Sequence, residues 1–383
     1  KYLIFKLRNK HTSRDRCASL QKLRMKITRK IFWFHFLLAV VILNSSCKNS
    51  GYKTDNSGSV TNKTDAKIDT TQWLKETRGI RDILEDKNGN LWFSSPDYIA
   101  KFDGRTMYYF SQNDGLNIVG NLHEDINGTI WIENGFKIFR YNGKRFIAEK
   151  FDNNLVSNEN QNSIWLQRGL SPTDTLYVEP GLYNLNRKKT EFIPFPLTKD
   201  DNNKYLYYPT TKVYMGADSI IWAGTMEKIF GLKNNSFITI GREEMGRQND
   251  ERQIGIRGIF VDSEGKVWIA DNGAGIFVYN GNETINFTKR HNLDEGDNDG
   301  NTLHRAFSIA EDSLGNMWFG TVYSGIWRYN SKTDEFKNYT KDDGVNSDNI
   351  WTIYRTRNGA LLFGGESPAS VYKFNGIGFD RIY

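Results

Sequence analysis

The chain has 383 residues and a formal net charge of +6, but residues 1–46 hold 11 of its 51 Lys and Arg and one of its 45 Asp and Glu. The remaining residues therefore carry 40 bases and 44 acids, and this balance argues against a nucleic-acid-binding surface, which needs a basic face. Aromatic residues make up 14% of the chain, with 34 Gly, 7 Pro and only Cys17 and Cys47, a composition that favours short strands and glycine turns and excludes a disulfide-rich domain.

The N-terminal 46 residues read as a leader. Residues 1–24 contain no Met, and we expect them to be an upstream extension that is not native. Residues 25–46 begin with a basic segment and continue into the apolar run 31–43, which suits a signal peptide and is short for a membrane span. Asn44-Ser45-Ser46-Cys47 resembles a bacterial lipobox, so we predict a lipoprotein signal peptide with lipid attached at Cys47; an ordinary signal peptide with an incidental cysteine is the alternative.

A polar segment separates this leader from the first apolar repeat. Residues 47–76 are rich in Lys, Asn, Ser, Thr, Asp and Gly, and we predict a flexible tether. The residues after Cys47 lack the acidic pair that often marks export to the cell surface. We therefore expect a lipid-anchored protein of the outer membrane that faces the periplasm.

From residue 77 to residue 383 one pattern recurs: an alternating strand, a turn, a strand centred on an aromatic residue, a glycine turn and an aromatic strand. The copies centre on Trp92, Trp131, Tyr177, Trp222, Trp268, Trp318 and Leu362. Successive centres are 39, 46, 45, 46, 50 and 44 residues apart, which is the length of one propeller blade. The sequence therefore predicts an all-β fold, a seven-bladed β-propeller of four-stranded antiparallel blades.

The strands are apolar on both faces. In the first copy Leu91 and Phe93 alternate with Trp92, so one face can contact the preceding blade and the other the following blade. The sequence Asp-x-x-Gly, as at Asp86 and Gly89, suits a tight turn between a blade's first and second strands.

The segments 312–330 and 336–345, with their Trp-Phe-Gly-Thr and Asn-Tyr-Thr-Lys-Asp-Asp-Gly cores, resemble the two-component regulator propeller repeat. That repeat forms the periplasmic sensor of hybrid two-component systems, many of which detect oligosaccharides. The resemblance implies a sensor-like binding domain. Those sensors continue into an immunoglobulin-like domain, a membrane span and a kinase, whereas this chain stops at Tyr383, so we do not carry over signalling through an attached kinase.

In a propeller, the loops between blades and the loops between second and third strands reach the same face, where ligands usually bind. Aromatic, Arg, Asn and Glu side chains in these loops suit a sugar or a peptide. The predicted ligand-binding residues are Arg78, Tyr98, Asn134, Glu227, Arg257, Asn272, His304, Arg305, Tyr323, Asn349, Trp351 and Glu366.

Signals of catalysis are weak. His123, His291 and His304 form no His-x-x-x-His pair, and no Gly-x-Ser-x-Gly elbow occurs. The acidic segment 295–300 has part of a calcium loop, but Ala306 stands where the closing Glu belongs, which favours a solvated insertion. We predict no catalytic residue, no metal and no cofactor.

The leading hypothesis is therefore a non-enzymatic, sensor-like propeller lipoprotein of the bacterial cell envelope, with a glycan, a peptide or an envelope protein as its partner. Two alternatives remain. One is an envelope enzyme of the propeller type, such as a lyase, and the other is a structural or assembly lipoprotein.

Overall fold

The computed structural model describes residues 67–69, 74–111, 116, 120–133, 137–149, 164–168, 179–185, 190–216, 219–247, 255–294, 302–366 and 369–383. The predicted signal peptide, Cys47, Asn134, Tyr177 and the acidic segment 295–300 lie outside these residues. Residues 63–383 form one compact unit.

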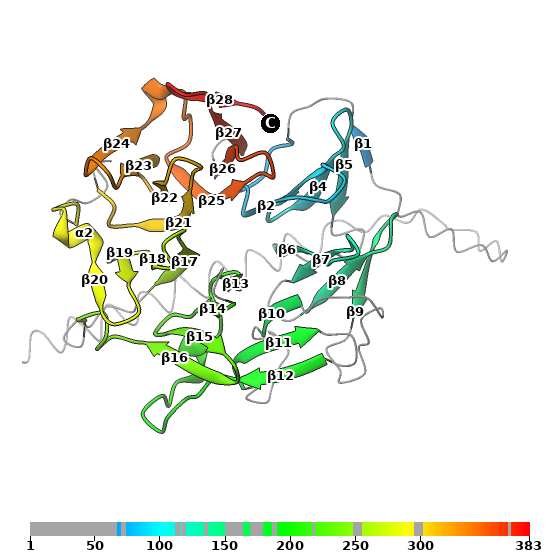
Figure 1. Ribbon diagram of the computed structural model, residues 1–383. Helices are drawn as coiled ribbons and strands as arrows, with labels where there is room; N and C mark the ends of the chain where they lie inside the picture. The colour runs from blue at the N-terminus through cyan, green and yellow to red at the C-terminus, as the bar shows by residue number, and fades with distance from the viewer. Residues whose placement is uncertain are drawn as a thin grey trace, which may run out of the picture. The chain divides into compact units, whose positions relative to one another are not determined.

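The described residues form seven antiparallel sheets arranged in a ring, which confirms the predicted seven-bladed propeller (Figure 1). The first three blades comprise β1 (Lys67–Asp69), β2 (Asp82–Glu85), β3 (Leu91–Ser94), β4 (Tyr98–Phe102) and β5 (Met107–Ser111); β6 (Asn121–Glu124), β7 (Ile130–Glu133), β8 (Ile138–Tyr141) and β9 (Phe146–Glu149); and β10 (Ile164–Arg168), β11 (Gly181–Leu185) and β12 (Thr190–Pro194).

Each of the last four blades has four described strands. They are β13 (Tyr214–Met215), β14 (Ile221–Gly224), β15 (Ile229–Lys233) and β16 (Ser236–Ile240); β17 (Ile256–Val261), β18 (Val267–Asp271), β19 (Gly275–Tyr279) and β20 (Thr284–Asn286); β21 (Ala306–Glu311), β22 (Asn316–Thr321), β23 (Ile326–Asn330) and β24 (Glu335–Tyr339); and β25 (Asn349–Arg355), β26 (Leu361–Glu366), β27 (Ser370–Phe374) and β28 (Phe379–Arg381).

Helical structure in the described part is limited to short turns. These are η2 (Lys204–Tyr207), α2 (Phe287–Arg290) and η3 (Lys341–Asp343). Within the described ranges, no helix has both the length and the hydrophobicity that a membrane crossing requires. Lys67–Asp69, which lie in the segment predicted as a tether, pair as β1 with the outer strand β5.

The third blade corrects one sequence assignment. The repeat pattern predicts a centre at Tyr177, but β11 pairs with β10 along one edge and with β12 along the other. No strand can lie between β10 and β11, so the second strand of this blade is β10. Its central residue is Trp165, which lies opposite Asn184 as Trp131 lies opposite Arg140 in the second blade.

Seven hydrophobic clusters fill the spaces between neighbouring blades in the described part of the ring. Trp92 belongs to the cluster shared with the second blade, and Phe93 belongs to the cluster shared with the seventh. Both side chains are almost fully buried. The predicted use of both sheet faces is therefore confirmed.

The ring closes by packing between the first and last blades. The Ile80 N–H donates to Gly365 O (3.1 Å), and the Tyr383 ring lies 5.2 Å from Phe93 and 5.1 Å from Phe102, centroid to centroid. The last blade takes all four of its strands from residues 349–381, so within the described residues no strand is exchanged across the closure. Figure 1 shows the C-terminus beside the strands of the first blade.

The Asp-x-x-Gly turns hold the central tryptophans. In four blades the Asp Oδ1 accepts backbone N–H groups two and four residues ahead, and its Oδ2 accepts the indole Nε1–H six residues ahead. The Oδ2–Nε1 distances are 2.9 Å for Asp86–Trp92, 3.0 Å for Asp125–Trp131, 2.7 Å for Asp262–Trp268 and 2.8 Å for Asp312–Trp318. The turn glycines have positive φ, for example +80° at Gly89.

The fourth blade lacks this hydrogen bond. Gly216 occupies the position of the aspartate, because its N–H donates to Ile220 O as the Asp86 N–H donates to Asn90 O. The Trp222 Nε1 atom is buried and has no hydrogen-bond partner among the described residues. This blade is a natural control for the contribution of the bond.

Trp268→Phe should destabilise the protein by about 1–2 kcal/mol more than Trp222→Phe, because only Trp268 loses a hydrogen bond to a carboxylate. Both residues are nearly fully buried, so the loss of ring volume is comparable. Urea unfolding of the two variants measures the difference. Equal destabilisation would contradict a contribution from the Asp–Trp bond.

The same turns should sensitise the fold to acid. Burial alone would raise the pKa of Asp312, but hydrogen bonds from Trp318, Asn316 and the backbone outweigh burial and hold that pKa below its ordinary value. Ionised Asp312 therefore stabilises the folded state above pH about 4, and this contribution is lost as the pH falls through the folded-state pKa.

Asp312→Asn cannot titrate, so its deficit in unfolding free energy relative to the parent protein should be largest at neutral pH and should shrink below pH 4. Urea unfolding at a series of pH values measures both proteins. A deficit that is constant from pH 7 to pH 3 would show that the carboxylate charge is irrelevant.

Candidate functional site

The innermost strands of three consecutive blades begin with a β-bulge. The pairing shifts by one residue between Ile256 and Gly258 in β17, between Ala306 and Ser308 in β21, and between Ile350 and Thr352 in β25. The extra residues are Arg257, Phe307 and Trp351. A bulged residue leaves the alternation of the strand, so its side chain is freed from the packing between blades.

These residues contact one another across the blades at the mouth of the central channel. The Arg81 guanidinium, at the start of the first blade, lies 3.8 Å from the centroid of the Trp351 ring. Trp351 meets Phe307 edge to face at 4.5 Å, and the Arg257 guanidinium lies 5.8 Å from the Phe307 centroid. We call Arg81, Trp351, Phe307 and Arg257 the inner ladder. Cation–π and edge-to-face contacts hold these four side chains next to one another in that sequence.

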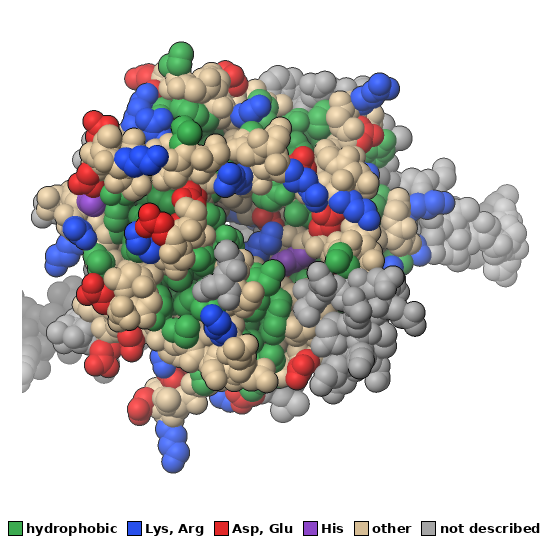
Figure 2. Space-filling model, in the orientation of Figure 1, with side chains coloured by type: hydrophobic (Ala, Val, Ile, Leu, Met, Phe, Trp, Pro, Cys, Tyr) green, Lys and Arg blue, Asp and Glu red, His purple; other side chains and the backbone are tan. Residues whose placement is uncertain are grey.

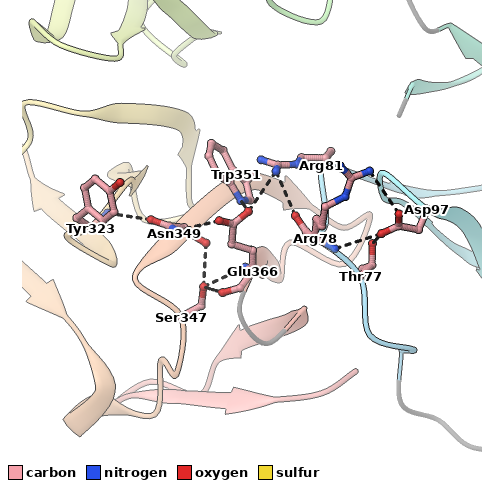
Figure 3. A network of polar contacts seen from close by, with 9 residues as sticks. All are labelled: Thr77, Arg78, Arg81, Asp97, Tyr323, Ser347, Asn349, Trp351 and Glu366. Carbon is pink, nitrogen blue, oxygen red and sulfur yellow. Dashed lines mark hydrogen bonds and ion pairs between the residues drawn. The ribbon is translucent and has the colours of Figure 1, made fainter. Parts of the chain in front are cut away.

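Glu366, at the end of β26, joins the ladder to the loops (Figure 3). Its Oε1 accepts from Asn349 Nδ2 (3.0 Å), and its Oε2 accepts from Trp351 Nε1 (2.7 Å) and Arg81 Nη2 (3.1 Å). The side chains of Glu366 and Arg81 are 19% and 27% exposed. Burial lowers the pKa of Arg81 and Glu366 opposes that effect, so the guanidinium stays charged.

The network continues along the loops of the sixth and fifth blades. Asn349 Oδ1 accepts from the Tyr323 N–H (3.1 Å), and Figure 3 shows the tyrosine ring pointing away from the network. The Arg305 guanidinium lies 5.0 Å from the Tyr323 ring centroid, and Arg305 Nε donates to Asn272 Oδ1 (2.9 Å). Tyr323 has a φ of +73° and is 44% exposed, which is unusual for a large side chain.

Six predicted ligand-binding residues thus form one connected group, which we call the rim cluster: Asn272, Arg305, Tyr323, Asn349, Trp351 and Glu366. It spans the loop face of the fifth, sixth and seventh blades. Its aromatic, guanidinium, amide and carboxylate groups are held by one another, so they are preorganised for a polar ligand.

Two more predicted residues adjoin these groups. Arg257 belongs to the inner ladder. Arg78 is highly exposed, pairs with Asp97 (Nη2–Oδ1 3.4 Å), and accepts Arg81 Nη2 at its carbonyl oxygen (3.1 Å). Figure 3 shows Arg78 and Asp97 beside Arg81, on the side away from Tyr323.

The structure places three further predicted residues outside both the rim cluster and the inner ladder. Tyr98 lies in β4, where its buried hydroxyl donates to Lys75 O (2.6 Å) and burial raises its pKa. Glu227 is buried and binds Arg242 through both carboxylate oxygens, at 2.6 and 3.1 Å. The His304 backbone accepts from the Gly273 N–H (3.1 Å) near the rim cluster.

Arg81 and Phe307 were missed from the sequence. Both occupy the same place in the repeat as Arg257 and Trp351, one residue after an apolar residue and two residues before an isoleucine. That recurring pattern was the available signal. It is weak, because a regular strand would direct this residue into the space between blades.

An ion pair crosses the channel one residue further along the inner strands. Lys212 of the fourth blade lies 2.9 Å from Asp82 of the first blade, Nζ to Oδ2. Asp82 is buried and also accepts the Leu122 N–H (2.7 Å). These two blades are not neighbours in the ring, so the pair spans the channel. Figure 2 shows basic side chains and a histidine in the central hollow.

His123 and Glu133 form a second polar pair in the inner part of the second blade. His123 Nε2 lies 3.5 Å from Glu133 Oε2, and Glu133 is fully buried while accepting the Gln167 N–H (2.9 Å). In the described part of the chain, no three His, Cys, Asp or Glu side chains are placed to hold one metal ion.

The sequence profile described as two component regulator propeller matches residues 76–97 and 302–323. These two segments of the chain therefore match the two-component regulator propeller repeat. One matched segment contains Arg81 and Asp82, and the other contains Arg305, Phe307 and Tyr323, so both include residues of the candidate site. No curated protein matches the sequence.

Several solved structures share the fold of this chain. One is the extracellular domain of a protein described as a one component system of B. thetaiotaomicron, with a TM-score of 0.57 and 16% identity. The match covers 81% of this chain but only 40% of that domain. A streptogramin B lyase matches with a TM-score of 0.55, 13% identity, 83% of this chain and 98% of the lyase.

A selenomethionine-substituted virginiamycin B lyase from Staphylococcus aureus matches with a TM-score of 0.51, 14% identity, 80% of this chain and 98% of the enzyme. At these identities the three similarities show the propeller fold alone.

Glu366→Ala should lower the unfolding free energy by about 1–3 kcal/mol, because the partly buried Arg81 and the Trp351 indole lose their shared acceptor. Asp97→Ala is the matched control on the same face. It removes an exposed ion pair and should change the unfolding free energy by less than about 1 kcal/mol. Chemical denaturation of both variants tests this, and equal effects would contradict a special role for Glu366.

Proposed function

We propose that this protein is a non-enzymatic, sensor-like propeller of the bacterial cell envelope that binds an oligosaccharide at the rim cluster. The observation that carries the proposal is the rim cluster itself. Six side chains from three blades are joined by hydrogen bonds and cation–π contacts around an exposed tyrosine.

The chemistry of the rim cluster suits a sugar. An exposed aromatic ring can stack on the apolar face of a pyranose, and fixed amide, carboxylate and guanidinium groups can bind its hydroxyls. Tyr323 supplies such a ring, and Asn349 holds its backbone in place. Preorganised polar groups lose little side-chain entropy on binding, which favours a specific complex.

The proposed location rests on the repeats and on the leader. The match to the two-component regulator propeller repeat supports an extracytoplasmic sensor, and one structure of similar fold is the extracellular domain of a protein described as a one component system. We further propose that lipid at Cys47 anchors the protein to the outer membrane, facing the periplasm. Labelling with a radioactive fatty acid in cells tests the anchor, and Cys47→Ser should abolish the label.

Binding should depend on the exposed tyrosine. A glycan array followed by calorimetry on the best oligosaccharide should show binding. Tyr323→Ala should weaken that binding by about tenfold or more, because a sugar ring stacked on one aromatic side chain gains much of its contact area from it. Tyr205→Ala is the control, since Tyr205 in η2 is also well exposed (54%, against 44% for Tyr323) but lies outside the rim cluster.

Two results would count against the proposal. If no glycan binds and an envelope protein co-purifies stoichiometrically, with Tyr323→Ala releasing it, then the rim cluster is a protein-binding surface. If Tyr323→Ala and Tyr205→Ala weaken glycan binding equally, the rim cluster is not the binding site.

A further inference from the structure

Arg257 is a charged side chain at the channel mouth that the structure leaves unpaired. Its Nε atom is buried and has no hydrogen-bond partner among the described residues, and no carboxylate there forms an ion pair with its guanidinium. Burial lowers its pKa, although the guanidinium remains protonated at neutral pH. A partly desolvated cation without a partner is costly, so a half-buried arginine whose buried Nε lacks an acceptor can accommodate an anion.

One carboxylate, that of Asp271, acts electrostatically on Arg257, but the two side chains form no ion pair among the described residues. Asp271 Oδ2 accepts from Arg247 Nη1 (3.2 Å) and from the Gly255 N–H (2.8 Å), whereas its Oδ1 is buried without a hydrogen-bond partner there. Elsewhere at the channel mouth, Arg81 forms an ion pair with Glu366, and Lys212 forms one with Asp82. The charges of each pair cancel, so neither pair offers a net positive charge to an anion.

Arg305, on the next blade, is a second arginine without a carboxylate partner among the described residues. Its guanidinium lies over Tyr323 and its Nε donates to the neutral Asn272, and within the described ranges it has no ion pair with a carboxylate. Backbone pairing connects the two arginines, because Arg305 bridges to Asn272, and the neighbouring Asp271 lies opposite Ile256. Two guanidiniums without carboxylate partners therefore lie in the sector between the fifth and sixth blades.

The surroundings favour a planar anion that is attached to a ring. The Phe307 ring centroid lies 5.8 Å from the Arg257 guanidinium, and the centroid of the exposed Tyr323 ring lies 5.0 Å from the Arg305 guanidinium. Asp82 and Lys212 meet across the channel one residue deeper, which limits how far a ligand could enter. An arginine fork binds a carboxylate through two parallel hydrogen bonds, and this geometry suits a carboxylate group better than a neutral hydroxyl.

We propose that the site between the fifth and sixth blades binds the carboxylate of an acidic, uronic-acid-containing oligosaccharide, with Arg257 and Arg305 as the anion-binding residues. This inference rests on the proposed function, because it specifies the class of oligosaccharide that the rim cluster recognises. The sugar ring that bears the carboxylate would lie at Tyr323, and the carboxylate would point towards Arg257.

The experiment compares matched acidic and neutral oligosaccharides on the full protein by calorimetry at low salt. The probes are oligogalacturonate against galacto-oligosaccharide and oligoglucuronate against cello-oligosaccharide, each of three sugars. At least one acidic member should bind tenfold or more tightly than its neutral counterpart, and its affinity should fall as salt is raised. The neutral sugars should show little dependence on salt.

The matched variants are Arg257→Met and Arg105→Met. Arg257→Met keeps an unbranched apolar stem but removes the guanidinium and its charge, and it should reduce acidic-sugar affinity by about tenfold or more. Arg105 is an exposed arginine in the β4–β5 turn, far along the chain from the rim cluster, and its substitution should leave both affinities unchanged. Arg305→Gln provides a second test should Arg257→Met fail to fold.

The outcomes separate this inference from the proposed function. If neutral sugars bind as tightly as acidic ones, the inference is overturned and oligosaccharide binding stands. If acidic sugars bind better but Arg257→Met and Arg305→Gln leave their affinity intact, the assignment of the anion site is overturned. Binding of neither class overturns both proposals.

Discussion

The structure depends on one constraint: each blade is apolar on both faces and must be covered by two neighbours. Trp92 and Phe93 are adjacent in the chain, yet each packs into a different space between blades. An open row of seven such sheets would expose an apolar face at each end, and only a closed ring removes both exposed faces. The contacts of Tyr383 and Ile80 between the last and first blades are therefore as important as any contact within a blade.

Closure of the ring also creates the candidate site. In the described part of the ring the first strands converge on a narrow channel, where regular alternation directs side chains into the packing between blades. The bulges at Arg257, Phe307 and Trp351 release one residue per blade from that alternation, and these released residues contact one another in order around the channel. A shift of one residue in the pairing therefore lets a strand pack between blades and also present a side chain at the channel mouth.

Much of the architecture could be predicted from the sequence, because a repeating pattern of aromatic centres and glycine turns is a local signal. The third blade shows where that signal failed. Trp165 lacks the preceding Asp-x-x-Gly turn, while Asp174 and Tyr177 resemble a weak copy of the repeat, so the centre was placed twelve residues too late. The Asp-x-x-Gly turn that marks the centre in four other blades is absent from the sequence before Trp165.

The candidate site was predictable in part for a topological reason. Loops between blades and loops after the second strands reach one face, so residues such as Asn272 and Glu366 were brought together as expected. Their pairing was not predictable, because hydrogen bonds such as Trp351–Glu366 depend on side-chain positions fixed by tertiary packing. Arg81 and Phe307 escaped notice because a bulge changes the facing of one residue without changing the apolar pattern around it.

The proposed anion site carries two arginines, whereas the propeller and its tether together have a negative net charge. This contrast determines how an acidic ligand would be recognised. Residues 47–383 carry 40 bases and 44 acids, so at long range the propeller does not attract an anion. Salt screens charges beyond about 8–10 Å, so a bound anion would depend mainly on the nearby guanidiniums of Arg257 and Arg305, which form no ion pair among the described residues. Selectivity for an acidic sugar would therefore arise from contact geometry and desolvation at the channel mouth, and would appear in the dissociation rate more than in the association rate.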